Sequence, residues 1–199
     1  DQVPRIVLET VFNSTLTEKG RGVLLASFAP KNAKEIGVSA FADVGLPFTL
    51  AQINEIFNPE QIHLFLQDYR WYNPLKTILQ SLSEDSILDK LVPDLIGRET
   101  DTKLDLFYGE EIFAFSHDTC EERVGTVSSY LNKGARLVTN DPTLPLGEAV
   151  STPAYVLMQT IEGYPQPLSR DQIDRAFRKH SLTIQTIGEN WIIAEKGAV

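Results

Sequence analysis

The start of the chain alternates apolar runs with turn-forming residues in a pattern typical of strands. Residues 4–12, 22–29 and 36–44 are rich in Val, Ile, Leu, Phe and Thr, and polar stretches that contain Gly20 and Pro30 separate them. Short β-branched and aromatic runs bounded by such residues indicate strands joined by turns. We therefore predict an antiparallel N-terminal meander, in which the first two strands form a hairpin with a long loop.

From residue 49 to residue 97 the apolar positions return at helical spacing. A polar residue that commonly caps helices precedes each apolar run, and a proline directly follows two of these caps. We therefore expect a run of short helices, with His63 exposed on the polar face of the second. The caps are Thr49, Asn58, Asn73 and Ser83, and the second helix would carry its apolar stripe on Ile62, Phe65, Leu66 and Tyr69.

The pattern then changes again, first to strands and later to helices. Residues 103–108 and 112–116 flank Gly109 and predict a central hairpin, which a helix from about residue 119 to 131 and a strand at 135–139 follow. Asp118 or Thr119 would cap that helix in a capping box. The last 48 residues predict a helix at 154–162, a helix that begins with a Ser169–Gln172 capping box, and a hairpin of residues 182–187 and 191–194.

These elements predict an α+β fold. Its antiparallel sheet would consist of the N-terminal meander and the central hairpin, with a helical insertion at residues 49–97. The loop that contains Pro142, Pro145 and Gly147 suggests a boundary between a core of residues 1–150 and a small subdomain of residues 151–199. That subdomain would be a helix-helix-hairpin unit, which is also the element order of a winged helix.

Composition narrows the class of protein. The formal net charge of −9 comes wholly from residues 49–152, which disfavours binding to phosphate backbones and suits a protein partner with a basic surface. One cysteine cannot form an internal disulfide, and no apolar run reaches the ~20 residues of a membrane span. We expect a cytoplasmic protein, although the chain begins with Asp1 and an N-terminal targeting segment therefore stays open.

The residues closest to reaction chemistry are Cys120 and His117. A thiol in the first turn of a helix, near an imidazole, can act as a nucleophile. Three neighbouring carboxylates at Asp118, Glu121 and Glu122 oppose ionisation of that thiol, and no oxyanion loop accompanies the pair. A half-buried structural cysteine is therefore the favoured interpretation, and a thiol-dependent enzyme or thiol sensor is the alternative.

Two other groups of residues could bind a macromolecule. One is an aromatic cluster at a predicted helix junction, of a composition that is favoured at protein interfaces. The other is a set of cations on the helix that starts at Ser169, which would contact DNA if the C-terminal unit were a winged helix. The aromatic cluster is Tyr69, Arg70, Trp71 and Tyr72, and the cations are Arg170, Arg175, Arg178 and Lys179.

These observations favour a non-enzymatic binding, assembly or regulatory protein that acts through protein–protein contacts of an acidic α+β domain. Neither metal-ligand spacing nor a glycine-rich phosphate loop is present in the sequence, so we predict no metal site and no cofactor. The thiol enzyme and the winged-helix DNA-binding regulator remain the alternatives.

Overall fold

The computed structural model divides the chain into two compact units, Asp1–Ile96 and Gly97–Val199. Seven strands are described, three in the first unit and four in the second. The described residues are 30–40, 46–66, 68–82, 85–98, 100–110, 112–113, 119–141, 169–187 and 191–197.

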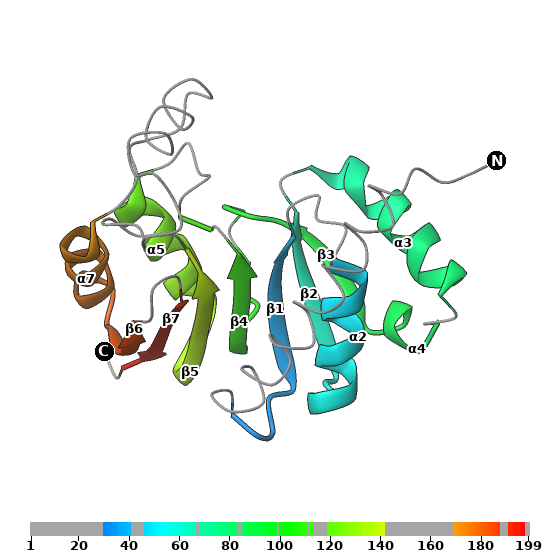
Figure 1. The fold of residues 1–199 in the computed structure, drawn as a ribbon, viewed down its shortest axis with the longest axis horizontal. Coiled ribbons are helices and arrows are strands. Elements are labelled where there is room, and N and C mark those ends of the chain that lie inside the picture. The colour runs from blue at the N-terminus through cyan, green and yellow to red at the C-terminus, as the bar shows by residue number, and fades with distance from the viewer. Residues whose placement is uncertain are drawn as a thin grey trace, which may run out of the picture. The chain divides into compact units, whose positions relative to one another are not determined.

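The first unit alternates strands and helices, as Figure 1 shows. Its strands lie in the order β3-β2-β1, and both neighbouring pairs are parallel. Parallel strands need a crossover between them, and α2 is the crossover that joins β1 to β2. The elements are β1 (Glu35–Ala40), α2 (Leu46–Phe57), β2 (Gln61–Leu66), η1 (Tyr69–Trp71), α3 (Tyr72–Ser81), α4 (Asp85–Leu88) and β3 (Leu91–Leu95).

The central strand of this unit is apolar almost throughout. Five of the six residues of β2 are buried, because the strand has a neighbour on each side and lies within the core. The polar residue among these five is His63, which is 5% exposed and whose Nε2 lies 2.7 Å from Glu35 Oε2 on β1. Pro93 lies in β3, which is at the end of the strand order, where a missing N–H donor is tolerated.

The second unit contains four strands in the order β4-β5-β7-β6. β4 and β5 are parallel, whereas β7 runs antiparallel to both of its neighbours. Helices α5 and α7 lie side by side in Figure 1, and each begins with a complete capping box, at Thr119 and at Ser169. The elements are β4 (Leu104–Glu110), α5 (Cys120–Tyr130), β5 (Leu131–Asn140), α7 (Arg170–Lys179), β6 (Leu182–Ile187) and β7 (Trp191–Lys196).

The fold class predicted from the sequence is wrong: the sheet is mostly parallel and the fold is α/β. Residues 36–44 were expected in an antiparallel meander, but β1 pairs in parallel with β2, and residues 4–12 and 22–29 lie outside the described residues. The expected central hairpin is also wrong, because β4 pairs in parallel with β5 and Ile112–Phe113 form a turn. A parallel sheet buries its strands on both faces, which hides the alternation that identifies strands in a sequence.

The predicted helical insertion at residues 49–97 is wrong in part. Helices α2 and α3 are confirmed, but the helix expected after Asn58 is strand β2, and β3 occupies residues assigned to the end of the helical run. The exposed position expected for His63 is wrong for the same reason. The helices that begin after Thr119 and Ser169 are confirmed, as is the final hairpin.

The C-terminal hairpin does not stand apart as the wing of a winged helix. β7 pairs with β5 over Arg136–Asn140, so the hairpin extends the sheet of the second unit. The domain boundary predicted near residue 150 and the helix predicted at 154–162 fall outside the described residues. Among the residues that the structure describes, no helix is both long enough and apolar enough to span a membrane.

Candidate functional site

The carboxyl ends of the first unit's strands form one level edge. Ala40 pairs with Leu66, and Leu66 pairs with Leu95, so β1, β2 and β3 all end at the same height. In open α/β sheets, ligands bind outside the carboxyl ends of the strands, where the loops that follow the strands supply the contacts. This edge is therefore the place to look for a binding site in the first unit.

Asp68 is the acidic residue that follows the end of β2. It caps the short helix η1, and its Oδ1 accepts a hydrogen bond of 2.8 Å from the backbone N–H of Arg70. Its Oδ2 accepts a hydrogen bond of 2.7 Å from Arg70 Nε, and Arg70 Nη2 lies 2.5 Å from the same oxygen. The side-chain hydrogen bond from Arg70 is the largest cause that lowers the pKa of Asp68, so this carboxylate is ionised at neutral pH.

Helix α2 begins close after the end of β1. Residues 41–45 connect the two and read Phe-Ala-Asp-Val-Gly; they lie outside the described residues. The free N–H groups and the macrodipole of a helix N-terminus favour a negatively charged ligand group. The strand–connection–helix order, followed 23 residues after Gly45 by Asp68, has the spacing of a nucleoside-binding α/β unit, in which the acidic residue binds ribose hydroxyls.

The carboxyl edge of the second unit holds a buried carboxylate, Asp141. It follows β5 and is fully buried. Its Oδ1 accepts a hydrogen bond of 2.8 Å from the backbone N–H of Phe113, and its Oδ2 accepts one from Thr139 Oγ1. Phe113 in turn makes an edge contact with Phe177 of α7, at 5.6 Å between ring centroids. Asp141 therefore fixes the segment after β4 against the end of β5.

Cys120 lies in the first turn of α5, as expected, but it is not an activated thiol. Burial, then the charge of Asp141, then that of Glu121 raise its pKa to about 12. A nucleophilic cysteine needs the opposite shift, because the thiolate is the reactive form. His117, its proposed partner, lies outside the described residues. The described residues contain no group of three or more His, Cys, Asp or Glu that could hold a metal ion.

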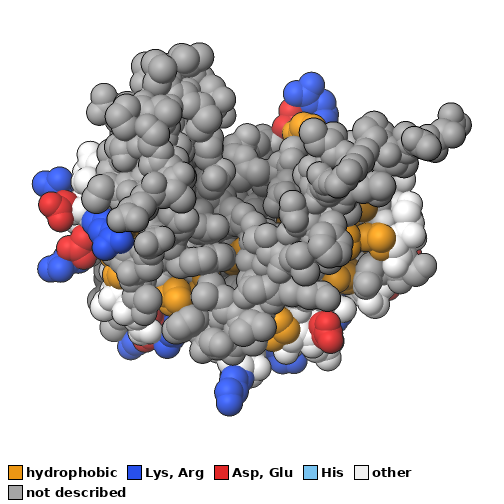
Figure 2. All heavy atoms as spheres, in the orientation of Figure 1, with side chains coloured by type: hydrophobic (Ala, Val, Ile, Leu, Met, Phe, Trp, Pro, Cys, Tyr) orange, Lys and Arg blue, Asp and Glu red, His pale blue; other side chains and the backbone are white. Residues whose placement is uncertain are grey.

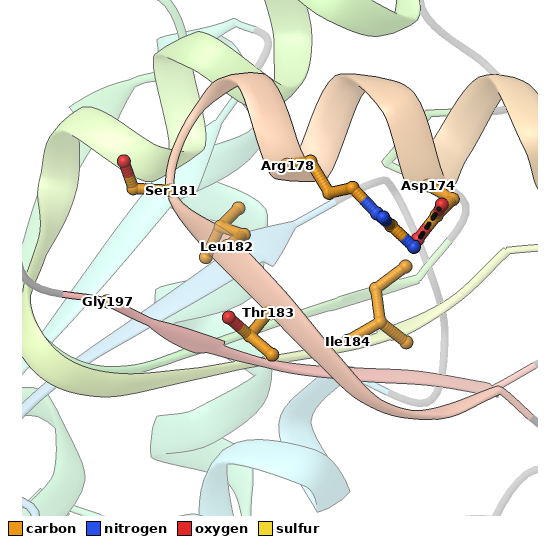
Figure 3. Close-up of a pocket in the computed structure, with 7 residues that line it drawn as sticks. All are labelled: Asp174, Arg178, Ser181, Leu182, Thr183, Ile184 and Gly197. Carbon is orange, nitrogen blue, oxygen red and sulfur yellow. Dashed lines mark ion pairs between the residues drawn. The ribbon is translucent and has the colours of Figure 1, made fainter.

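A pocket of about 460 Å³ lies in the second unit between α7 and β6 (Figure 3). Arg178 and Asp174 project toward each other above Ile184 and form an ion pair of 2.9 Å. Leu182, which also lines the pocket, is the first residue of β6, a strand that runs parallel to β5 because both are antiparallel to β7. The pocket therefore lies at the amino ends of the parallel strands, opposite the edge where α/β sheets bind ligands.

The cations proposed to contact DNA do lie together on α7, but acidic groups accompany them. Figure 2 shows blue and red side chains interleaved over the part of the surface where α7 lies in Figure 1. Arg178 pairs with Asp174, Lys179 pairs with Glu121, and Arg175 Nε donates to its own helix. Arg170 also has a partner. Together with the pairing of β7 to β5, these contacts remove the basis of the winged-helix interpretation.

The aromatic cluster predicted to bind a partner is held together by η1. Tyr69 and Trp71 are 42% and 53% exposed, Arg70 is exposed, and Tyr72 begins α3 and is half-buried. No described contact tests a partner at this surface, so it stays a prediction. The sequence interpretation placed Arg70 in this cluster and missed the neighbouring Asp68, because the segment before it was assigned to a helix and not to a strand.

Comparison with solved structures gives the fold. The chain aligns with a geranyl diphosphate methyltransferase in complex with SAM (S-adenosylmethionine) at a TM-score of 0.67 and 12% identity, over 89% of this chain and 84% of that one. The geranyl diphosphate C-methyltransferase from Streptomyces coelicolor A3(2) gives 0.67 and 11%, over 90% and 80%. Mitomycin 7-O-methyltransferase gives 0.64 and 12%, over 92% of this chain and 54% of that one, so this chain spans about half its length.

The other two comparisons found nothing. No protein-family model matches the chain, and no curated protein matches it. The structural likeness establishes a Rossmann-like α/β fold, as in SAM-dependent methyltransferases. It also overturns the interpretation as a non-enzymatic binding, assembly or regulatory protein, because the solved structures that share the fold include several enzymes. The same finding supports neither the thiol enzyme nor the DNA-binding regulator.

Proposed function

We propose that this protein binds S-adenosylmethionine and catalyses transfer of its methyl group to a small-molecule acceptor. The observation that carries the proposal is Asp68, a carboxylate at the carboxyl end of β2 in a fold that SAM-dependent methyltransferases share. An ionised carboxylate at this position suits a ribose, whose two hydroxyls are hydrogen-bond donors.

The residues of the first unit fit the cofactor in a second respect. The cofactor carries an amino-acid carboxylate besides its nucleoside, and the N-terminus of α2 offers a site for a negative group directly after the connection from β1. That connection contains one glycine, Gly45, and not the three of a dinucleotide-binding loop. Asp68 would therefore hold the ribose, and the start of α2 would face the carboxylate.

The bound cofactor would supply an electrophilic methyl group on its sulfonium. The protein's part in such a reaction is to bind, to orient the two reactants and to exclude water. Asp141 accepts a hydrogen bond from the backbone N–H of Phe113 and so holds that segment in place at the carboxyl edge of the second unit. The net charge of −9 repels phosphate backbones, which supports a small molecule over a nucleic acid as the acceptor.

A binding experiment tests the cofactor. Calorimetric titration with S-adenosylmethionine and S-adenosylhomocysteine should give saturable binding to the wild-type chain. Asp68→Asn keeps the shape of the side chain and removes its charge, and it should weaken binding about tenfold or more, as expected for a lost charged hydrogen-bond acceptor. Wild-type protein that binds neither compound at millimolar concentration would contradict the proposal.

Glu60→Gln is the matched control for Asp68→Asn. Glu60 directly precedes β2 and makes an exposed ion pair of 3.6 Å with Lys34, so its substitution removes the same charge at the opposite end of the same strand. Its affinity for the cofactor should equal that of the wild type. Equal losses in Asp68→Asn and Glu60→Gln would assign the effect to net charge and not to a site at Asp68.

The acceptor can be sought with cofactor that carries a tritiated methyl group, by following the label into small molecules separated from the protein.

A cytoplasmic location is a further proposal, supported by the free thiol of Cys120, since reducing compartments keep thiols free. Cell fractionation tests it, and recovery in an oxidising compartment would contradict it.

A further inference from the structure

The carboxylate assigned to the ribose already has an occupant. Arg70 reaches Asp68 with three nitrogen atoms: its backbone N to Oδ1, and Nε and Nη2 to Oδ2. A carboxylate oxygen accepts about two hydrogen bonds through its lone pairs. The guanidinium of Arg70 therefore fills the capacity of Oδ2, and the backbone N–H takes one of the two positions on Oδ1.

The two kinds of contact differ in how firmly they are held. The backbone bond caps η1 and is fixed by the geometry of that turn. The side chain of Arg70 is 90% exposed, so no packing holds its guanidinium against Asp68, and only the charge-assisted hydrogen bonds do. Exposed ion pairs of this kind change an equilibrium constant by a few-fold at most and weaken as salt is added. The guanidinium can therefore swing away without disturbing the fold.

We propose that Arg70 sets the cofactor affinity of this site by competing with the ribose for the Asp68 carboxylate. This inference rests on the proposed function. A ribose that donates both hydroxyls to Asp68 needs more positions than the guanidinium leaves free, so binding includes release of Arg70 from Oδ2. The measured affinity is then the intrinsic affinity multiplied by the fraction of molecules in which Arg70 has left the carboxylate.

The test compares S-adenosylhomocysteine binding by calorimetry in four proteins: wild type, Arg70→Gln, Arg70→Lys and Lys76→Gln. Arg70→Gln should bind about two- to fivefold more tightly than the wild type, the range that an exposed ion pair allows. Arg70→Lys keeps the charge and loses the planar two-nitrogen contact, so it should fall between them. Lys76 is an exposed cation on α3, and Lys76→Gln should leave the affinity unchanged.

Salt supplies a second readout. Raising the salt concentration from about 0.05 M to 1 M screens the pair between Asp68 and Arg70, so the ratio of wild-type to Arg70→Gln dissociation constants should shrink toward one. A third readout needs no cofactor: an NMR titration of the Asp68 carboxyl carbon should show a higher pKa in Arg70→Gln, because the side-chain hydrogen bond that lowers it is gone.

The outcomes separate this inference from the proposed function. If the wild type binds and Arg70→Gln binds equally or more weakly, the competition is refuted while the cofactor site stands. If only Arg70→Gln binds at millimolar concentration, the result contradicts the proposed function for the wild type, while it supports the competition between Arg70 and the ligand at Asp68. If neither binds, the proposed function fails, and the inference fails with it because the carboxylate has no ligand to lose.

Discussion

Gly125 in the middle of α5 allows the end of α7 to pack against it, and replacing it tests this packing directly. A Cβ atom at Gly125 would lie 2.8 Å from Cε1, 3.2 Å from Nε2 and 3.3 Å from Nδ1 of His180. The shortest of these distances is one that Cβ atoms essentially never show, so the imidazole has to move in Gly125→Ala. The ring can lie this close to α5 only because position 125 has no side chain.

Hydrogen bonds hold the backbone of His180 in place, so the backbone cannot easily shift to relieve the conflict. Its carbonyl oxygen accepts hydrogen bonds of 2.8 Å from Ser128 Oγ and 2.9 Å from Lys196 Nζ, and its N–H donates to Ala176 and Phe177 at the end of α7. Overpacking of this kind costs about 1–3 kcal/mol. Alanine in place of glycine inside a helix contributes about 1 kcal/mol in the other direction. The difference predicts a net loss of about 0–2 kcal/mol in the free energy of unfolding.

A double-mutant cycle measured by urea unfolding separates the two effects. In a His180→Ala background the steric conflict is gone, so Gly125→Ala should stabilise the protein by about 1 kcal/mol. Thr126→Ala is the control, since the neighbouring position should respond equally in both backgrounds. Gly125→Ala that stabilises the protein by the same amount with and without the His180 ring would refute the argument.

Four further changes test other contacts. Since burial raises the Cys120 pKa from 9.0 to about 12, the folded thiol stays protonated; its contribution to stability is complete below about pH 9 and is lost as the pH rises toward 12. Urea unfolding at several pH values should show this slope in the wild type but not in Cys120→Ala. Asp141→Asn should lower the Cys120 pKa, which a faster rate of alkylation at pH 9 would reveal, while an unchanged rate would contradict the contact. Ser169→Ala should cost about 1 kcal/mol of stability through the lost capping box, and His63→Leu about 1–3 kcal/mol through the lost bond to Glu35, both measured by urea unfolding.

Helix boundaries could be predicted from the sequence because capping is local. The capping boxes at Thr119 and Ser169 need only residues three positions apart, and both are present in the structure. The buried face of α7 consists of Ile173, Ala176 and Phe177, which lie at the local spacing of one face of a helix. Strand pairing depends on residues far apart in the chain, and nothing local distinguishes a parallel neighbour from an antiparallel one.

Strand β2 shows why the parallel sheet was missed. Ile62, Phe65 and Leu66 match the spacing of a helix stripe, but Leu64 is buried as well, because both faces of the strand are covered. A continuous apolar run of this length fits a buried strand as well as a helix. The neighbouring Asn58 was interpreted as a helix start; its φ of 43° and its bond to Asn54 show that it ends α2 instead.

The error about β2 also concealed the candidate site. Asp68 can be recognised as a candidate binding residue only when it is seen to follow a strand. A helix assigned to residues 59–69 places it instead on an ordinary polar face of that helix. The spacing of an apolar strand at 36–40, a helix, and a second apolar run at 62–66 is that of a βαβ unit, about 30 residues in all, and was the signal available in the sequence. With that unit in place, an acidic residue after the second strand predicts a ribose contact.

The lack of a recognisable nucleophile in the sequence does not exclude an enzyme that uses a cofactor. The sequence was interpreted as non-enzymatic because no residue set resembled a reaction centre. Among the described residues, the thiol of Cys120 is protonated, and Asp141 is held by hydrogen bonds to Phe113 and Thr139. An enzyme whose cofactor brings the reactive carbon needs neither an activated thiol nor a free base of that kind; it needs groups that bind and orient. Asp68, which would hold the ribose, is such a group. A protonated thiol at Cys120 and an internally bonded Asp141 therefore carry no argument against cofactor-dependent group transfer.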